Sequence, residues 1–418
     1  MAEIVRQVAG SDERLRVVGA GHSWSDAVLT DGHLMSLDGL AEIVETDAER
    51  GMARVQGGAR LKDMLEAFAA AGLAFENLGS IAEQSIAGAI STGTHGSSRR
   101  YGNLATQVTA LRFVDGRGQV HAWSAETHSD AFRTAVLSLG CLGVITEVTL
   151  RCRPAFDLHE RTWSIPFEDA ARDLVSLSES AEFIKLWWLP HTDRVQIYAA
   201  DTVVDTGVDT GADAGADTPR SGPGPVAKWM DARVMPHVFT AVLGLGRMAP
   251  ALMPGLNRIV AGAYFKTSER VDRSDHVLMT LMPPKHREAE YAIDVSDAGA
   301  AFTELRDRIV SEKLRVNFLQ ELRFVAKDAL PLSPDHGRDT CRFGIYSGQS
   351  SHCDRYFRLA EDMLLARGGR PHWGKEFFTE PAALRAMYPE LSQVAKLRQQ
   401  FDPKGVFRNA FVNRLFDE

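Results

Sequence analysis

The chain has 418 residues, 44% hydrophobic and 24% charged, which is typical of a soluble globular protein with room for two domains. Its 47 basic and 55 acidic residues leave a formal net charge of −8, which argues against nonspecific nucleic-acid binding. The four cysteines form no Cys-x-x-Cys pair, so the sequence predicts no metal cluster and no disulfide framework. This cysteine usage, with Glu3 and no apolar leader at the start, predicts a cytoplasmic protein.

The first predicted strand, residues 15–18, ends in the turn Gly19-Ala20-Gly21-His22-Ser23. Neither glycine has a Cβ, so a ligand can approach the backbone closely. A Rossmann fingerprint would need a third glycine at the position of Trp24, so this is not a Rossmann loop. The turn predicts either an ordinary strand end or a cofactor site in which the histidine itself bonds the cofactor.

A helix is predicted over residues 60–72, where apolar residues recur at helical spacing. A segment rich in glycine and hydroxyl residues follows at 79–96. The backbone N–H groups and hydroxyls of such a loop suit a pyrophosphate, and tight packing in a core is the alternative. A strand over 144–150 is predicted to close a first domain of residues 1–152.

A second α+β domain is predicted over residues 153–384, with a strand at 185–189. The acidic, low-complexity stretch 201–226 cannot bury a core and is predicted to be a mobile loop. The apolar stretch 228–264 is interrupted by arginine and proline, so cap helices are expected rather than an integral membrane segment. The last segment, about 385–418, is expected to return to the first domain.

The two glycine-rich segments resemble the FAD-binding domain of the vanillyl-alcohol oxidase superfamily. Residues 19–23 resemble its Gly-x-Gly-His-Ser turn, with Thr30-Asp31-Gly32 following, and residues 91–96 resemble its Ser-Thr-Gly-Thr-His-Gly pyrophosphate loop. The resemblance implies FAD joined covalently through His22, with His95 as a competing attachment residue that belongs to the phosphate loop. No cysteine lies between 79 and 96, so a doubly linked flavin is not implied. The implied cofactor-binding residues are Gly19, Ala20, Gly21, His22, Ser23, Gly79, Ser80, Ser85, Gly88, Ser91, Thr92, Gly93, Thr94, His95, Gly96, Ile145 and Lys375.

Further segments resemble the aldonolactone oxidase subgroup of that superfamily, which includes L-gulonolactone and D-arabinonolactone oxidases and has alditol oxidases as close cousins. These segments occur in order along the second half of the chain, at 321–325, 332–334, 337–339, 369–375, 387–389 and 401–409. The resemblance implies a two-domain α+β fold, in which an FAD-binding domain is joined to a cap domain built on an antiparallel sheet that faces the flavin.

The catalytic hypothesis centres on two charged residues in an expected strand. Glu321 and Arg323 lie two residues apart, so both side chains are expected on the same side of that strand. The carboxylate can accept hydrogen bonds from sugar hydroxyls and the arginine can stabilise negative charge, whereas a solvated ion pair is the alternative. Lys375 adds a second cation, and His372 is either an acid–base group or a hydrogen-bonding anchor. The resemblance implies that these four residues are catalytic, and that the substrate-binding residues are Ser80, Glu321, Arg323 and Tyr346.

The implied reaction is hydride transfer from the carbon that bears the 2-hydroxyl of an aldono-1,4-lactone, with oxygen as acceptor and hydrogen peroxide as product. Gly79 lies where the family controls oxygen access and leaves space there. Gly344 and Tyr346 stand where alditol oxidases carry histidine and threonine, which weakens an alditol assignment. An alditol or other carbohydrate oxidase and a flavoprotein without turnover remain alternatives, and the oligomeric state stays open. Only 21 residues precede His22, so we expect either a truncated start or a different way of binding the adenine end of FAD.

Overall fold

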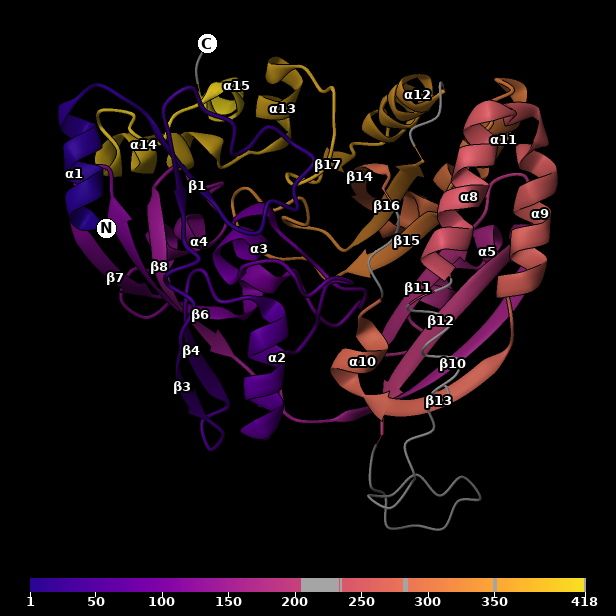
Figure 1. Ribbon diagram of the computed structural model, residues 1–418, viewed down its shortest axis with the longest axis horizontal. Helices are drawn as coiled ribbons and strands as arrows, with labels where there is room; N and C mark the ends of the chain where they lie inside the picture. The colour runs from indigo at the N-terminus through magenta and orange to yellow at the C-terminus, as the bar shows by residue number, and fades with distance from the viewer. Residues whose placement is uncertain (204–232, 234, 281–284, 349–351, 417–418) are drawn as a thin grey trace.

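The computed structural model describes residues 1–203, 233, 235–280, 285–348 and 352–416 and is built around two large sheets, one in each half of the molecule (Figure 1). The first half holds a five-stranded antiparallel sheet in the order β3 (Ile43–Asp47), β4 (Met52–Gln56), β8 (Gly143–Arg151), β6 (Val108–Asp115) and β7 (Val120–Ser124). Two small pairs accompany it: parallel β1 (Leu15–Val18) with β2 (His33–Ser36), and antiparallel β5 (Leu73–Ala74) with β9 (Arg153–Pro154).

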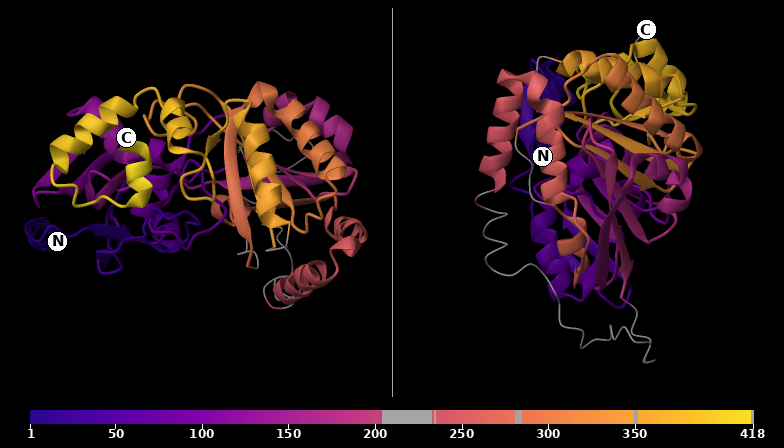
Figure 2. Two further views of the ribbon diagram at one scale, coloured as in Figure 1. Left: turned by 90° about the horizontal axis from the view of Figure 1, so that it is seen from above. Right: turned by 90° about the vertical axis from the view of Figure 1, so that its right-hand side faces the viewer.

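Helices from both ends of the chain complete this first half. They are α1 (Ala2–Gly10), α2 (Leu61–Ala70), α3 (Ile86–Thr92), η1 (Leu104–Gln107), α4 (Ser129–Val136), α13 (Pro381–Met387), α14 (Leu391–Phe401) and α15 (Ala410–Phe416). Figure 2 shows the yellow C-terminal helices beside the indigo N-terminal segment. The backbone N–H of Leu15 donates to the carbonyl of Val406 at 2.8 Å, and the guanidinium of Arg16 donates to the carbonyl of Phe407. We therefore propose the predicted division, with residues 1–152 completed by about 385–418.

The second half, the cap, is built on an eight-stranded sheet whose neighbouring strands are all antiparallel. Its order is β13 (Ser268–Arg273), β10 (Asp157–Pro166), β12 (Arg194–Thr202), β11 (Phe183–Trp188), β15 (Gln320–Val325), β16 (Thr340–Ser347), β14 (Arg287–Asp294) and β17 (Arg370–Pro371). The cap helices are α5 (Phe167–Arg172), α6 (Leu174–Ser178), α8 (Met235–Met248), η2 (Pro250–Leu252), α9 (Met253–Tyr264), α10 (Ser274–Leu278), η3 (Val295–Asp297), α11 (Ala298–Ser311) and α12 (Cys353–Leu365).

The two faces of the cap sheet have different chemistry because side chains alternate along each strand. On β15, Leu322 and Phe324 pack into the apolar core that α5, α11 and α12 cover. Their neighbours Glu321 and Arg323 therefore point to the opposite face, which looks toward the first half of the molecule. The same alternation on β11, β14 and β16 places polar and aromatic side chains on that face.

Most of the predicted elements are confirmed. The strand at 15–18 is β1, the helix at 60–72 is α2, and the strands at 144–150 and 185–189 correspond to β8 and β11. The glycine-rich segment 79–96 was predicted to be a loop, but its residues 86–92 form the helix α3. The predicted acidic loop begins too early, because β12 extends to Thr202; its remainder from residue 204 lies outside the described residues.

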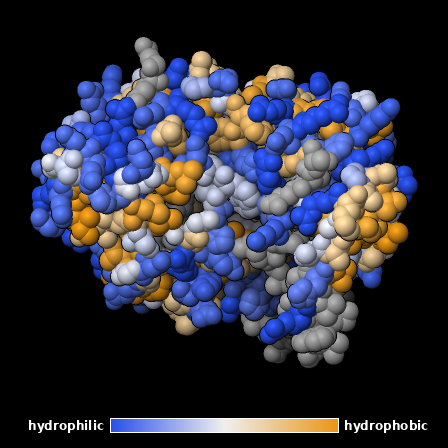
Figure 3. Space-filling model, turned by 45° about the horizontal axis from the view of Figure 1, so that its top comes forward, coloured by the Kyte–Doolittle hydropathy of each residue, from blue (hydrophilic) through white to orange (hydrophobic). Residues whose placement is uncertain are grey.

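The stretch 228–264 forms α8, η2 and α9 where the structure describes it. Within the described parts of the chain, no single helix is long and apolar enough to cross a membrane. Two consecutive segments, His237–Met248 and Pro250–Tyr264, are together long and apolar enough, but the chain bends by 118° between them. Large hydrophobic side chains are exposed on this pair, including Met248 and Ile259. Figure 3 shows hydrophobic residues gathered at the right-hand edge of the molecule, over this region.

Candidate active site

Two adjoining cavities lie where the cap sheet faces the first half. We label the larger, of about 190 Å³, the substrate cavity and the smaller, of about 140 Å³, the dinucleotide cavity. His22, Ser23, Gln84 and Thr92 line both. The predicted glycine turn therefore opens into both spaces, with the histidine at the junction.

The dinucleotide cavity has features that fit FAD. Gly21, in the left-handed region with φ +72°, has open space where a Cβ would stand, whereas a Cβ on Gly19 would collide with Ser85 Oγ. Ser85 Oγ and Gln84 Oε1 are buried at this cavity and have no hydrogen-bond partner among the described residues. Buried polar atoms usually have partners, so these two oxygens are available to a bound cofactor.

Most of the predicted cofactor residues line one of the two cavities. The dinucleotide cavity is lined by Gly19, Ala20, Gly21, His22, Ser23, Ser85, Gly88, Ser91, Thr92 and Ile145. The substrate cavity is lined by Gly79, Ser80, Thr94, His95 and Lys375. Gly93 and Gly96 line neither: the first ends α3 with φ +74°, and a Cβ on the second would collide with the side chain of Asn77. These two glycines shape the loop. His95 lines the substrate cavity and not the dinucleotide cavity, and its place in a phosphate-binding loop stays a prediction.

Glu321 and Arg323 form a buried ion pair on the cavity face of β15. Arg323 Nη2 lies 2.7 Å from Glu321 Oε2, and the arginine also donates to Ser80 Oγ in the first half. Trp187 Nε1 donates to Glu321 Oε1 at 2.8 Å, and the Tyr346 hydroxyl donates to Oε2 at 3.2 Å. Burial, the largest single influence, raises the pKa of Glu321, but the charges of Arg323 and Lys185 and the hydrogen bonds from Trp187 and Arg323 together outweigh it and lower that pKa. The solvated ion pair considered above is thus wrong.

Lys375 lines the same cavity from the segment that follows β17. Its ammonium pairs with the carboxylate of Glu288 on β14 and lies 4.5 Å from the centre of the Trp24 ring. Burial, the largest single influence, raises the pKa of Glu288, but the Lys375 charge and the hydrogen bonds from His286 and Lys375 together outweigh it and hold that pKa at about 2. The lysine therefore faces a neighbouring carboxylate rather than bulk solvent.

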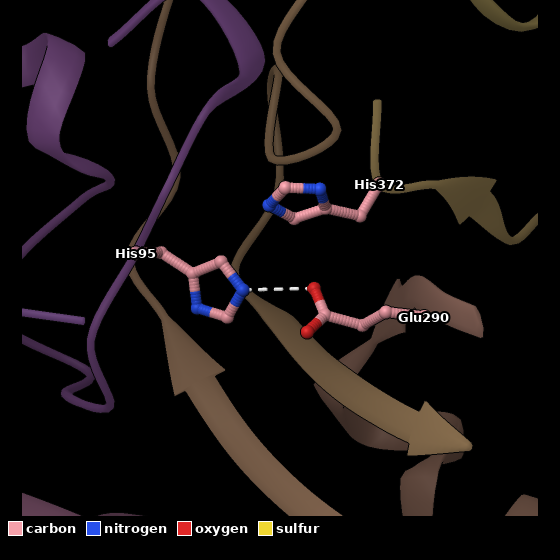
Figure 4. A group of neighbouring side chains, drawn as sticks. All are labelled: His95, Glu290 and His372. Atoms are coloured by element: carbon pink, nitrogen blue, oxygen red, sulfur yellow. Dashed lines mark hydrogen bonds and ion pairs between the residues drawn. The ribbon is translucent and has the colours of Figure 1, made fainter. Parts of the chain in front are cut away.

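His95, Glu290 and His372 form a buried cluster that crosses from the first half into the cap (Figure 4). His95 Nε2 contacts Glu290 Oε1 at 2.8 Å, and His95 Nδ1 donates to the carbonyl of Gly96 at 2.9 Å. Both ring nitrogens of His95 therefore face oxygen atoms, one from the first half and one from the cap. Arg342 also approaches Glu290 at 3.4 Å. The cluster is therefore a hydrogen-bonded link between the two halves.

The ligand-type atoms of this cluster lie within 4.8 Å of one another, a spacing that a metal ion could bridge. The contacts favour another arrangement. His372 Nδ1 accepts the backbone N–H of Gly374 at 2.9 Å, so the proton of the neutral ring sits on Nε2. Burial lowers the pKa of His372 to about 3. His372 is therefore a neutral hydrogen-bond donor, which supports the anchor among the two alternatives.

Several cavity residues were missed by the sequence analysis. Among them are Trp24, Trp187, His286, Glu288, Glu290 and Phe318. The polar–apolar alternation of residues 287–294 is a usable signal for a strand with two carboxylates on one face, but it also fits a solvent-exposed strand. His286 precedes that strand and carries no recognisable motif; its ring lies 5.1 Å from those of Trp24 and Phe318.

Comparison with known protein families agrees with this geometry. Residues 1–124 match the FAD binding domain family, and residues 148–415, more than half of the chain, match the D-arabinono-1,4-lactone oxidase family. The chain belongs to the D-arabinono-1,4-lactone oxidase family. Members of this family are flavin oxidoreductases, so the predicted family and enzyme class are confirmed.

Relatives within and around this lactone oxidase family span nearly the whole chain. The L-gulono-1,4-lactone dehydrogenase of Mycobacterium tuberculosis is 31% identical over 99% of this chain and 93% of its own length. The L-gulonolactone oxidase of Scyliorhinus torazame is 29% identical over 97% of this chain and 90% of its own. The D-arabinono-1,4-lactone oxidase of Kluyveromyces lactis is 26% identical over 97% of this chain and 90% of its own length.

Solved structures confirm the predicted α+β fold class. The cholesterol oxidase of Brevibacterium sterolicum superposes with a TM-score of 0.80 at 16% identity, over 99% of this chain and 92% of that one. A chitooligosaccharide oxidase superposes with a TM-score of 0.69 at 14% identity, over 98% of this chain and 88% of that one. These similarities concern the fold alone.

Proposed function

We propose that this protein oxidises a sugar-derived aldono-1,4-lactone by hydride transfer to FAD attached through His22, with molecular oxygen as acceptor and hydrogen peroxide as product. The buried Glu321–Arg323 pair carries this proposal, because it lies in the substrate cavity that the His22 turn also lines. The relatives reported above are named as oxidases or a dehydrogenase of aldonolactones, which supports the substrate class.

The residues of the cavity have distinct roles in this proposal. When bound, FAD supplies the two-electron chemistry. Glu321 is ionised and orients the substrate by accepting hydrogen bonds from its hydroxyls. Arg323 stabilises the negative charge that develops on the substrate oxygen, and Ser80, which accepts from Arg323, holds a neighbouring hydroxyl. His372 donates from Nε2 and anchors the substrate without exchanging its own proton. Lys375 adds positive charge at the side of Trp24.

Oxygen as acceptor is supported by the surroundings of Gly79. A Cβ at this position would lie 3.0 Å from Thr94 Cγ2 and 3.5 Å from the carbonyl of His95, tight against the cavity wall. Glycine therefore avoids a close contact with Thr94 at this edge of the substrate cavity, and a methyl group here would narrow the cavity or displace Thr94. A dehydrogenase that uses another acceptor is the alternative, and the Mycobacterium tuberculosis relative is named a dehydrogenase.

Covalent attachment is supported by the place of His22 at the junction of the two cavities and by its protonation. Partial burial lowers the pKa of this histidine, which keeps the imidazole neutral and nucleophilic. Acid precipitation of the yellow protein tests the link: flavin that stays with the precipitate, and is released in His22→Ala, supports it. Free flavin in the supernatant of the wild type would refute it.

Turnover is tested by following oxygen consumption and peroxide formation with a panel of aldono-1,4-lactones. Stoichiometric peroxide with at least one lactone supports the complete proposal. Lactone turnover only with an artificial acceptor would leave a dehydrogenase, and turnover of alditols alone would replace the proposed substrate class.

A further inference from the structure

We propose that Gly344 and Tyr346 act together as the element that selects ring-form lactones over open-chain alditols. This inference rests on the lactone oxidation proposed above and assigns its substrate selectivity to two named residues. Both lie on β16, the strand between the two strands that carry the cavity carboxylates. In the register of the sheet, Gly344 pairs with Glu321 on one side and with Glu290 on the other.

The phenol ring of Tyr346 occupies the space that a side chain at position 344 would fill. A Cβ on Gly344 would lie 2.7 Å from Tyr346 Cε2 and 3.2 Å from its hydroxyl oxygen. The ring therefore leans along the strand, over the glycine and across the middle of the cavity wall. Any larger residue at 344 forces this ring to move, so the two positions are linked sterically.

The ring is fixed in this place by its neighbours. The Tyr346 hydroxyl donates to Glu321 Oε2 at 3.2 Å, and the ring stacks on Phe318 with centroids 5.7 Å apart and planes at 16°. His286 approaches the same ring at 5.6 Å. Burial raises the pKa of Tyr346 well above its usual value, so the phenol is a neutral donor. Its single donor is therefore already engaged by the catalytic carboxylate.

This wall distinguishes substrates by their number of hydroxyl groups. An alditol carries a hydroxyl on every carbon, whereas a lactone of the same length has a carbonyl and a ring oxygen in place of some of them. Burying a hydroxyl against the faces of Tyr346 and Phe318 leaves it without a partner, which costs about 10-fold to about 100-fold in relative affinity for each such group. The flat lactone ring presents carbon atoms to the same aromatic faces without that loss.

Tyr346 has a simpler possible role, which is to support Glu321 through one hydrogen bond. The two roles predict different behaviour of Tyr346→Phe, which keeps the ring and removes the hydroxyl. If the ring selects the substrate, this variant loses up to about 10-fold in kcat/KM for lactone and keeps its preference for lactone over alditol. A supporting role alone gives Tyr346→Phe and Tyr346→Thr the same loss and the same preference.

The decisive experiment compares kcat/KM for an aldono-1,4-lactone and for the alditol of the same carbon number in flavin-loaded wild type, Tyr346→Phe and Tyr346→Thr. The threonine variant is expected to lower the lactone-to-alditol ratio by about 10-fold to about 100-fold, chiefly through a lower KM for the alditol. Gly344→Ala, which displaces the ring, is expected to shift the ratio in the same direction. Tyr101→Phe is the control, because it removes a partly buried tyrosine hydroxyl that donates to Glu182 outside the cavity. The lactone-to-alditol ratio of this variant should equal that of the wild type.

A binding measurement gives a readout without turnover. Calorimetric titration of the anaerobically reduced holoprotein with the alditol should show tighter binding to Tyr346→Thr than to wild type. An unchanged lactone-to-alditol ratio in Tyr346→Thr, while the wild type oxidises lactone, would overturn the selectivity proposal alone. No oxidation of any lactone by the wild type would overturn the proposed function and this inference with it.

Discussion

Replacing Arg323 by alanine removes the cation that the proposed mechanism needs most. In the wild type, this guanidinium lies 2.7 Å from Glu321 Oε2 and also donates to Ser80 Oγ, so it links the cap strand β15 to the first half of the molecule. Alanine leaves Glu321 as a buried carboxylate that keeps its hydrogen bonds from Trp187 and Tyr346 but has lost its closest positive charge.

The expected magnitudes follow from that environment. Breaking a buried ion pair by removing one partner costs about 3–5 kcal/mol of unfolding free energy. Removing one preorganised group that stabilises developing charge costs about 3–4 kcal/mol of activation free energy, or about 100-fold to about 1,000-fold in rate. Arg323→Lys keeps the charge but cannot span both Glu321 and Ser80, so a loss of about 10-fold is expected for it.

The assay is anaerobic stopped-flow reduction of the bound flavin by lactone, together with thermal unfolding of the same preparations. Alanine should slow reduction by the stated factor while the flavin content stays at the wild-type level, and lysine should fall between alanine and wild type. Reduction at the wild-type rate in Arg323→Ala would refute the catalytic role of this residue. A loss of stability without a loss of rate would leave it only a structural role.

Three further predictions concern other parts of the site. Gly79→Ala places a methyl group 3.0 Å from Thr94 Cγ2, so it should slow reoxidation by oxygen at least about 10-fold more than it slows reduction; equal effects in rapid-mixing experiments would exclude this route for oxygen. Because the folded pKa of His372 is about 3, below its unfolded value, the stability from burying the neutral ring is complete above about pH 6.5 and is lost as the pH falls toward 3; His372→Gln should flatten that part of the stability curve, and an unchanged curve would contradict the assignment. His95→Asn breaks the bond to Glu290 and should lower the free energy of unfolding by about 3–5 kcal/mol, whereas EDTA should leave the wild-type Tm unchanged; a chelator-sensitive Tm would instead identify a metal site.

The sequence predicted those parts of the site that depend on local pattern. The spacing of Glu321 and Arg323 placed them on one face because strand geometry has a period of two, and the glycine turn before His22 follows directly from the end of a strand. The resemblance of ordered motifs supplied the family. The cytoplasmic location and the covalent link stay predictions.

Other features depend on pairings between strands that are distant in sequence. Nothing local indicates that Glu290 meets His95 across 195 positions, or that Trp187 reaches Glu321 from a neighbouring strand. The partner of His95 could not be predicted either: the motif indicates a phosphate loop, but the ring is hydrogen-bonded to the carboxylate of Glu290 in the cap. A sequence pattern specifies which face a side chain takes, whereas its partner is specified by the order of strands in the sheet.

The central claim is tested most directly by anaerobic titration of the purified yellow protein with aldono-1,4-lactones and, separately, with xylitol and sorbitol. The account predicts that at least one lactone bleaches the flavin absorbance and that neither alditol does so at equal concentration. Bleaching by alditols alone would contradict the assignment of the substrate cavity, and bleaching by neither class would contradict the proposed reaction.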